Sequence, residues 1–526
     1  MKRKLIFIFA ETLIFSMLFI QISAEDLSGS KSLKEKNYFE GFGTYIEHAM
    51  DQWDIPGAVI GVVKDNKVIF LEGFGYRDKE KKLPVDSRTL FCIGSCTKAF
   101  TATAVGMLVA EKKLKWNLPI KNMIPGIDLY DDFTSKYISA KDLLIQRTGI
   151  SGHDMVKDFN PIGREGLFKV LKYLKPNKSF REGFQYANIN YAIAAYLVDR
   201  SSGNSYEEYV DQNIFKPLGM NSSTFSIDKF QSNENSAQPY LTYGTAKVED
   251  WGEARINQRY FEINKSYNNL SAASGGIYSN AEDMIEWLKF NLNQGKVKND
   301  QILPKEILRT IHTPYMGLKY YPDSKESKFL AYGMGWFIDP YRGHYRIRHS
   351  GQVYGYMSEM SFMPEEKIGI IVMTNMYYHI FHENISKNIY DRLLGLNIID
   401  RNENSVKGLN NYIESSLKKD FLNFWSKKPE DAKLRHNLNE YQGDYKNPGY
   451  GNIRIVLKDN ELQVILKDQF KLQLLHYKEN TFATKSDIWN YNHKIFKFQK
   501  NDKGEIISLA ISLEPSVDDI IFVRNN

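Results

Sequence analysis

The pattern of apolar residues changes once along this chain, and the change divides the chain into two parts. From about Leu33 to Leu394, short β-rich runs alternate with longer helical patterns, whereas after about Asn437 apolar and polar residues alternate with a period of two. The first pattern is typical of a sheet with helices on its faces, and the second of half-buried antiparallel strands. We therefore predict an α/β (α+β) domain over residues 33–395 and a small antiparallel β-barrel over residues 437–526.

Individual elements can be placed within these parts. The predicted strands of the first domain include 58–63, 68–70, 357–363 and 368–373, and its predicted helices include 97–113, 190–201 and 281–292. We expect strands from both ends of this domain to share one antiparallel sheet, with the helices inserted between them along the chain. Residues 396–436 are rich in Asn, Lys, Glu and Ser, and apolar residues at helical spacing from Leu409 to Phe424 predict a linker with one amphipathic helix.

Length and composition exclude several classes of protein. A chain of 526 residues suggests two or three domains, and 42% hydrophobic residues supply a packed core, which excludes wholesale disorder. Only two cysteines are present, so a disulfide framework or a multi-cysteine metal site is excluded. The net charge of +6 is spread along the chain without a long basic run. Nucleic acid is therefore not an expected partner.

The first 24 residues predict export. Lys2, Arg3 and Lys4 precede an apolar stretch from Leu5 to Ile22, which is followed by small residues that resemble a cleavage site. This is the pattern of a signal peptide over residues 1–24, and it predicts a periplasmic or secreted protein. Because Glu11 interrupts the apolar stretch, an uncleaved membrane anchor is the competing interpretation. No later run of about 18 apolar residues occurs, so we expect no membrane span in the mature chain.

Ser95-Cys96-Thr97-Lys98 is the first candidate for chemistry. A serine at the start of a helix has a lysine one turn later on the same face, so the amine can take the serine proton and the helix start can offer N–H groups to an oxyanion. The same spacing recurs at Ser28, Ser226, Ser415 and Ser416. Only Ser95 follows a β-like run and opens a long helix with an apolar stripe. Taken alone, Ser95 could equally be a helix N-cap.

Two further groups could line a cleft. Tyr186-Ala187-Asn188 offers a phenol as a general base and an amide that can hold a substrate carbonyl, although Tyr278-Ser279-Asn280 has the same spacing. The latter directly precedes a predicted helix and is explained more simply as an N-cap. His349-Ser350-Gly351 follows a predicted strand, and its glycine would permit close approach of a substrate. Taken alone, a tyrosine of this kind is as often structural as functional, and a single histidine is more often structural or on the surface.

Other sequence features that could suggest a functional site have simpler structural explanations. His379 and His382 are one helical turn apart, but the sequence shows no third ligand beside them, so no metal is predicted. Gly73-Phe74-Gly75 lacks the third glycine of a dinucleotide site and is interpreted as a turn. Cys92 and Cys96, on either side of the serine, are expected to be small buried thiols rather than a redox switch.

Taken together and in this order, the three motifs resemble those of serine β-lactamase and penicillin-binding-protein-like hydrolases. The resemblance is to the class C-like branch, which includes esterases and D-amino-acid peptidases, and it covers residues 35–395. Leu143 to Gly149, Pro217 to Met220 and Tyr332 to Trp336 look like the same family. Residues 437–526 resemble, less specifically, the lipocalin-like domain that is appended to some members.

The resemblance implies a role for each matching residue. Ser95 would be the nucleophile, Lys98 its activating partner, Tyr186 the base and proton shuttle, and Asn188 a ligand of the substrate amide. His349, Ser350 and Gly351 would line the substrate site, and the backbone N–H groups of Ser95 and Gln352 would form the oxyanion hole. This sequence departs from the family in one place, because His349 stands where β-lactamases of this kind carry lysine. That weakens the expectation of a β-lactam substrate.

These observations predict an exported serine hydrolase that forms an acyl-enzyme on amide (peptide) or ester substrates and needs no metal or other cofactor. Its partner would be a small-molecule or peptide substrate, with cell-wall peptide as one candidate. Two alternatives stay open at this point. One is a true class C-like β-lactamase or D,D-carboxypeptidase, and the other is a catalytically silent protein that binds cell-wall peptide.

Overall fold

The computed structural model describes residues 38–160, 162–241, 268–353, 355–412, 428, 433–466, 470–485 and 494–525. Residues Gly41–Asn526 form one compact unit, separate from Met1–Glu40, and it is this unit that carries the fold. The predicted signal peptide, 1–24, lies outside the described residues, as does residue 413 onward of the predicted linker helix. Among the described residues, none of the helices is both long enough and apolar enough to cross a membrane.

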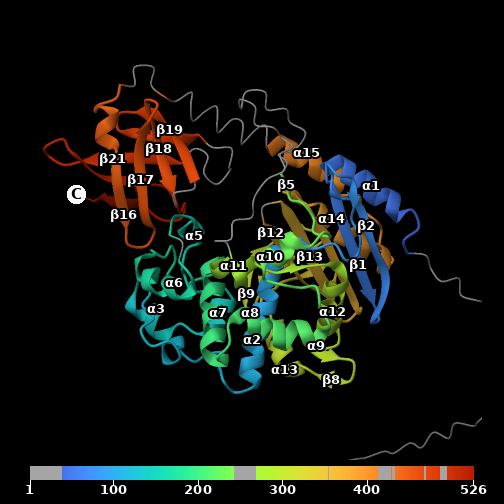
Figure 1. Ribbon diagram of the computed structural model, residues 1–526. Coiled ribbons are helices and arrows are strands. Elements are labelled where there is room, and N and C mark those ends of the chain that lie inside the picture. Colours follow the sequence, from blue (N-terminus) through green and yellow to red (C-terminus); the bar gives the residue numbers. More distant parts are fainter. Residues whose placement is uncertain are drawn as a thin grey trace, which may run out of the picture. The chain divides into compact units, whose positions relative to one another are not determined.

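A nine-stranded sheet forms the centre of the first part, with the order β3-β2-β1-β14-β13-β12-β11-β10-β9 (Figure 1). Its strands are β1 (Gly57–Lys64), β2 (Lys67–Asp78), β3 (Leu83–Pro84), β9 (Met316–Tyr320), β10 (Phe329–Tyr332), β11 (Phe337–Tyr341), β12 (His344–Val353), β13 (Tyr356–Met363) and β14 (Ile368–Thr374). Neighbouring strands are antiparallel, and β1 pairs directly with β14. The prediction that strands from both ends of the domain share one antiparallel sheet is confirmed.

The strands at the middle of the sheet are buried on both faces. All residues of β13 and β14 are buried, and so are those of β1 from Gly57 to Val63. This explains why β1 and β14 appear in the sequence as continuous apolar runs rather than as alternating patterns. The register Ile60 to Val372 brings the two ends of the chain's first domain together at the centre of the core.

Helices cover both faces of this sheet. The longer ones are α1 (Phe42–Trp53), α2 (Thr97–Ala110), α7 (Asn188–Ser202), α11 (Asn268–Gly275), α12 (Ala281–Leu292), α14 (Phe381–Leu393) and α15 (Asn402–Tyr412). α12 packs against β1 and β14, and α14 against β13 and β14. α2 is buried nearly all round, between α7, α11 and α13 (Lys305–Ile311). The three predicted helices, 97–113, 190–201 and 281–292, correspond to α2, α7 and α12.

The C-terminal part is a closed barrel of eight strands. They are β16 (Gly443–Asn447), β17 (Gly451–Lys458), β18 (Glu461–Leu466), β19 (Phe470–Lys478), β20 (Thr481–Lys485), β21 (Ile495–Lys500), β22 (Ile506–Ile511) and β23 (Ile520–Arg524). Ile453 and Ile455 of β17 point into the barrel and are buried, while Asn452 and Arg454 are exposed. The period-two pattern therefore predicted both the strands and the face that each residue occupies.

One local prediction needs correction. Gly73-Phe74-Gly75 is not a turn but lies inside β2, where Gly73 pairs with Val59 and Gly75 with Gly57 of β1. The ladder of hydrogen bonds to β1 overrides the preference of glycine for turns. At the start of the predicted linker, α15 packs against α1, and the Trp53 indole donates a hydrogen bond to Asn402 at 3.0 Å.

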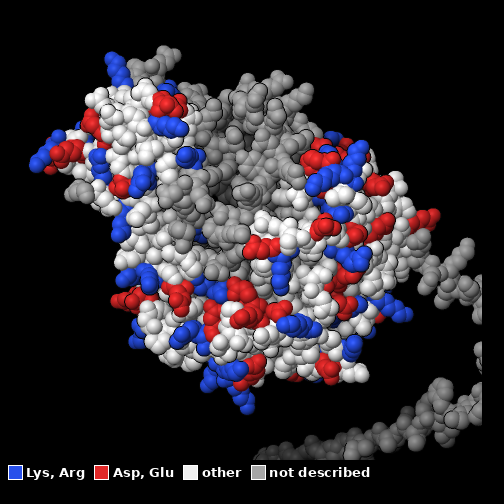
Figure 2. Space-filling model, viewed as in Figure 1, with Lys and Arg blue, Asp and Glu red and all other residues white. Residues whose placement is uncertain are grey.

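Charges are mixed on the visible surface. On the face shown in Figure 2, Lys and Arg are interspersed with Asp and Glu rather than gathered in one patch of a single sign. This agrees with the even spread of charge along the sequence.

Candidate active site

Ser95 and Lys98 lie together at the start of the buried helix α2. Ser95 is in the 3₁₀ turn Gly94–Cys96, which leads directly into α2, and Lys98 is in the first turn of the helix. Lys98 is fully buried, and its Nζ lies 3.0 Å from Ser95 Oγ. The predicted serine–lysine contact is therefore present in the fold.

The surroundings of Lys98 provide hydrogen-bond acceptors for its amine and lower its pKa. Nζ donates to Ser95 Oγ, to Asn188 Oδ1 at 2.8 Å and to the Ser274 carbonyl at 2.7 Å. Burial lowers the pKa of Lys98 to about 7, against a smaller upward effect of the Asp154 carboxylate. A substantial fraction of Lys98 is therefore neutral near pH 7 and can accept a proton.

Tyr186 lies beside this lysine, with Lys98 Nζ 4.8 Å from the centre of its ring. Burial raises the pKa of Tyr186 well above its usual value, and the neighbouring Tyr332 hydroxyl adds to this, whereas a hydrogen bond with Ser95 lowers it. The phenol therefore keeps its proton near neutral pH. Of the two side chains next to Ser95, Lys98 is the one whose neutral, proton-accepting form is accessible.

Asn188, the first residue of α7, links Lys98 to a residue that the sequence analysis did not identify. Its Oδ1 accepts from Lys98, and its Nδ2 donates to Asp154 Oδ1 at 2.8 Å. Asp154 is exposed, in the loop before the short helix Val156–Phe159. Neither Asp154 nor the Ser274 carbonyl belongs to a recognisable motif, and only the fold brings them to the lysine.

His349 is on β12 and is almost completely buried. Its Nδ1 lies 2.6 Å from the Ser350 carbonyl, which can only accept, so Nδ1 carries the proton and Nε2 accepts from the Tyr332 hydroxyl at 3.3 Å. The pKa of His349 is lowered to about 3, mainly by burial and to a smaller extent by the Lys98 charge. The imidazole is thus neutral, and it supplies no positive charge to this part of the site.

The third motif packs against the strand and turn that carry the serine. A Cβ on Gly351 would lie 1.9 Å from the Ile93 carbonyl oxygen, so only glycine fits at this position. Gly94 has φ +51°, and a Cβ there would lie 2.7 Å from the backbone N of Gln352. The backbone N–H groups of Ser95 and Gln352 are therefore carried on two segments in direct contact, as an oxyanion hole requires.

The remaining sequence candidates have structural roles. Tyr278 is buried in β6 (Tyr278–Ser279) and stacks on Phe230, and Asn280 caps α12 by accepting from the Asp283 N–H at 2.9 Å. The prediction of an N-cap is confirmed. Cys92 and Cys96 are free, buried thiols, and burial raises the pKa of each to about 12. They are protonated and unreactive at neutral pH, as predicted.

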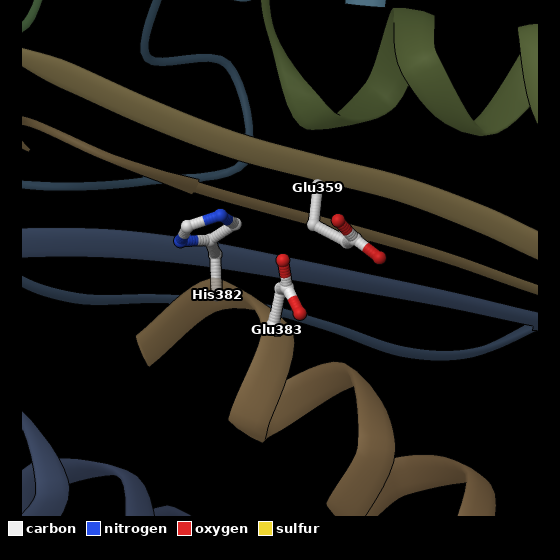
Figure 3. Close-up of side chains that lie close together, drawn as sticks. All are labelled: Glu359, His382 and Glu383. Carbon is white, nitrogen blue, oxygen red and sulfur yellow. The ribbon is translucent and has the colours of Figure 1, made fainter. Parts of the chain in front are cut away.

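A second cluster of ionisable side chains lies on the other side of β12. Glu359 of β13 and His382 and Glu383 of α14 place ligand-type atoms within 4.8 Å of one another (Figure 3). The sequence analysis found no third ligand-type group beside His379 and His382, whereas the fold brings Glu359, from a distant strand, next to His382 and Glu383. Arg348 compensates the two carboxylates, with Nη1 3.7 Å from Glu359 and 3.5 Å from Glu383. This is a buried ion cluster that already contains its own cation.

His379 packs edge-to-face against His382, with ring centroids 5.5 Å apart, but its ring nitrogens are engaged in other hydrogen bonds. Its Nδ1 accepts from the Phe381 N–H at 3.2 Å, so Nε2 carries the proton and donates to the Thr374 hydroxyl at 3.0 Å. Both ring nitrogens are thereby occupied by structural hydrogen bonds.

Comparison with known protein families identifies the family to which the chain belongs. The family model "Beta-lactamase" matches residues 42–385, which is well over half of the chain. The chain belongs to the Beta-lactamase family. Residues 427–523 match a second model, described as a domain of unknown function (DUF3471). The β-lactamase match includes all of the candidate site residues, and the second match covers the barrel.

Several known proteins are similar to this member of the family. Protein flp of Staphylococcus aureus (strain COL) is 28% identical over 338 residues, and the match covers 63% of this chain but only 62% of that protein. The octameric penicillin-binding protein homologue from Pyrococcus abyssi has a TM-score of 0.57 at 22% identity, over 92% of this chain and 99% of its own. The D-amino acid amidase from Ochrobactrum anthropi SV3 has a TM-score of 0.54 at 20% identity, over 68% and 97%.

Proposed function

We propose that this protein is an exported serine hydrolase that forms an acyl-enzyme through Ser95 on amide (peptide) or ester substrates. The observation that carries the proposal is the 3.0 Å contact between Ser95 Oγ and the buried amine of Lys98, whose pKa is lowered to about 7. A serine hydroxyl is a weak nucleophile until a neighbouring base accepts its proton. A catalytically silent binding protein would have no need of a buried lysine in this state.

In the first half of the reaction, neutral Lys98 accepts the Ser95 hydroxyl proton as Oγ attacks the substrate carbonyl carbon. The carbonyl double bond opens to a single C–O⁻ bond, and the N–H groups of Ser95 and Gln352 donate to that oxygen. Asn188, already held by Lys98 and Asp154, is placed to bind the substrate amide.

Collapse of the tetrahedral intermediate restores the carbonyl and breaks the bond to the leaving amine or alcohol. That group needs one proton, and Tyr186 passes it on from Lys98, because the phenol keeps its own proton and can donate as it accepts. Water then repeats the sequence on the acyl-enzyme. It loses a proton to Lys98 by the same route as its oxygen forms a bond with the acyl carbon. Collapse of this second intermediate breaks the bond between the acyl carbon and Ser95 Oγ, and the proton on Lys98 passes to Oγ, which releases the acid and free Ser95.

The neutral imidazole of His349 supports amide or ester substrates over β-lactams. A lysine at this position would offer an ammonium to a substrate carboxylate, a charge-assisted contact worth about 1.5–3 kcal/mol. Both ring nitrogens of His349 are instead hydrogen-bonded, Nδ1 to the Ser350 carbonyl and Nε2 to the Tyr332 hydroxyl. Within this proposal, cell-wall peptide is one candidate substrate and the barrel is a lipocalin-like accessory domain.

The proposal is tested by labelling the full chain with a fluorophosphonate and, separately, with a penicillin, followed by intact-mass measurement. We expect one fluorophosphonate adduct per chain, absent from Ser95→Ala and unchanged in Ser226→Ala. Ser226 is a matched control, since it has the same Ser-x-x-Lys spacing but caps the short helix Ile227–Ser232. Persistent labelling and activity in Ser95→Ala would overturn the proposal, and faster labelling by the penicillin would favour a β-lactamase or D,D-carboxypeptidase.

A further inference from the structure

The loop that carries Asp154 is held by the barrel. The backbone N–H of His153 donates to Glu514 Oε2 at 2.7 Å, and Glu514 lies in the segment between β22 and β23. Glu514 is nearly buried, and its other oxygen accepts from the Ser516 N–H at 3.2 Å. Burial raises the pKa of Glu514, but these hydrogen bonds outweigh it and hold the pKa below its usual value. The group is therefore a carboxylate, and a strong acceptor for the His153 N–H.

The His153 side chain adds a second contact to the barrel. Its Nε2 lies 2.8 Å from the Lys175 carbonyl, so Nε2 carries the proton and Nδ1 accepts from the Tyr450 hydroxyl at 2.8 Å. Both rings are buried. His153 also has φ +44°, a left-handed conformation that is uncommon for a residue with a side chain. Such a conformation persists only where surrounding contacts determine it, and two of these contacts come from the barrel.

The next residue is the one that reaches the active site. Asp154 accepts from Asn188 Nδ2 at 2.8 Å, and Asn188 Oδ1 accepts from Lys98 Nζ at 2.8 Å. An unbroken series of contacts therefore runs from Glu514 of the barrel, through His153 and Asp154, to the amine beside Ser95. Because Asp154 is exposed, its neighbours in the loop and Asn188 fix its position.

We propose that Glu514 is a positioning residue for the active site: by holding the His153 backbone, the barrel keeps Asp154 on Asn188 and thereby orients the amine of Lys98. This inference rests on the proposed function, since it assigns the barrel a part in the same acyl transfer. It also gives the C-terminal domain, which matches the family model described as a domain of unknown function, a defined role in catalysis.

Nearby ionisable groups influence the pKa values at both ends of this series of contacts. They therefore predict how the pH dependence of activity would change if the series were broken. Lys98 is faced by Asp154, Cys96 and Lys157, of which Asp154 has the largest effect and raises the lysine pKa. Glu514 is faced by His153, Tyr450, Lys494 and Asp154. If the loop is released, Lys98 loses the nearby carboxylate and its pKa falls further. The rise of activity with pH should then move to lower pH, which a merely structural defect would not cause.

The test compares three variants of the full chain in hydrolysis of a p-nitrophenyl ester and in fluorophosphonate labelling. Glu514→Ala removes the acceptor, and we expect kcat/KM to fall by about ten- to a hundredfold, the usual effect of small misplacement of catalytic groups. Its rising pH limb should shift to lower pH. Glu514→Gln keeps an oxygen that can accept from the His153 N–H, so it should recover most of the lost activity.

Asp519→Ala is the matched control, because Asp519 lies in the same segment between β22 and β23 but pairs with Lys497 of β21, inside the barrel. It should behave as the unchanged protein. If Glu514→Ala fails to fold, Tyr450→Phe provides the second variant, since it removes only the hydroxyl bonded to His153, and it should shift the pH limb in the same direction. The inference would be overturned if the effect of Glu514→Ala were no larger than that of Asp519→Ala. It would also be overturned if the pH limb did not shift in Glu514→Ala, or in Tyr450→Phe where Glu514→Ala does not fold. If Ser95→Ala stayed active, the proposed function itself would fail instead.

Discussion

Lys98 and Tyr186 lie side by side, with the lysine Nζ 4.8 Å from the centre of the phenol ring, and burial moves their pKa values in opposite directions. Burial disfavours the charged form of each group, which is the ammonium of Lys98 and the phenolate of Tyr186. At neutral pH, the same water-poor environment therefore increases the fraction of Lys98 in its neutral, proton-accepting form and decreases the fraction of Tyr186 that is a phenolate. This division underlies the roles proposed for them.

The first prediction concerns pH dependence. Because Lys98 must be neutral to accept the Ser95 proton, kcat/KM should rise with pH through an apparent pKa near 7. Asp154→Asn removes a carboxylate that raises this pKa, so the rise should move to lower pH. A pH–rate profile of each protein on an uncharged ester measures this. A profile that is flat between pH 5 and 9, or a shift to higher pH in the variant, would contradict the assignment of the base.

The second prediction separates the two tyrosines. Tyr186→Phe removes the hydroxyl that shuttles the proton and should lower kcat with little change in stability. Tyr278→Phe should leave kcat near its normal value, because Tyr278 is packed against Phe230 away from the serine. Steady-state kinetics with thermal melts of both variants decide the point. The reverse order of effects would transfer the shuttle role to Tyr278.

The third prediction concerns substrate preference. With a neutral His349, uncharged esters and amides should be hydrolysed at least as well as β-lactams at pH 7. His349→Lys should gain on substrates that carry a carboxylate and gain little on an ester. The comparison uses nitrocefin, a p-nitrophenyl ester and D-alanyl p-nitroanilide. A kcat/KM for nitrocefin tenfold above the others would refute the preference.

The sequence predicted those parts of the site that lie within short motifs. Ser95 and Lys98 are one helical turn apart, so their contact follows from local geometry once a helix forms there. Asp154, Glu514 and the Ser274 carbonyl reach the same place only through tertiary packing, and a single sequence contains no pattern that pairs residues so far apart. For the same reason, Glu359 could not be assigned to the neighbourhood of His382.

The fold was predicted most completely where burial and periodicity agree. The barrel strands alternate because one face is buried and the other exposed, and α12 was predicted with its observed bounds, 281–292. The turn assigned to Gly73-Phe74-Gly75 was wrong because local glycine content carries no information on the ladder to β1. The packing of α15 on α1 was not predicted, because periodicity shows that a helix has an apolar face but not which element covers that face.

The fourth prediction concerns stability. Burial raises the pKa of Glu359 to about 7, Arg348 lowers it in part, and Glu383 raises it. The unfolded value is about 4.3, so between pH 4.3 and 7 the folded protein holds a proton that the unfolded chain lacks, and stability falls as pH rises through that window. Glu359→Gln cannot ionise and should lose less stability from pH 5 to pH 7, by about 1 kcal/mol or more.

Urea unfolding at the two pH values measures this difference. Glu403→Gln is the control, because Glu403 is an exposed residue of α15 paired with Lys407, and it should keep the pH dependence of the unchanged protein. An identical slope in Glu359→Gln would show that Glu359 is not the titrating group.

The central claim is that Ser95 carries a covalent acyl group during turnover. The most direct measurement mixes the full chain with excess p-nitrophenyl ester, follows release of p-nitrophenol from the first milliseconds, and acid-quenches samples for peptide mass mapping. The account predicts a burst of about one p-nitrophenol per chain, or a trapped adduct where deacylation is slow, with the acyl mass on the peptide that contains Ser95. Ser95→Ala should show neither the burst nor the adduct and should lose turnover by as much as about 10⁶. Normal turnover with no acyl mass on Ser95, or an adduct on another serine that survives Ser95→Ala, would contradict the account.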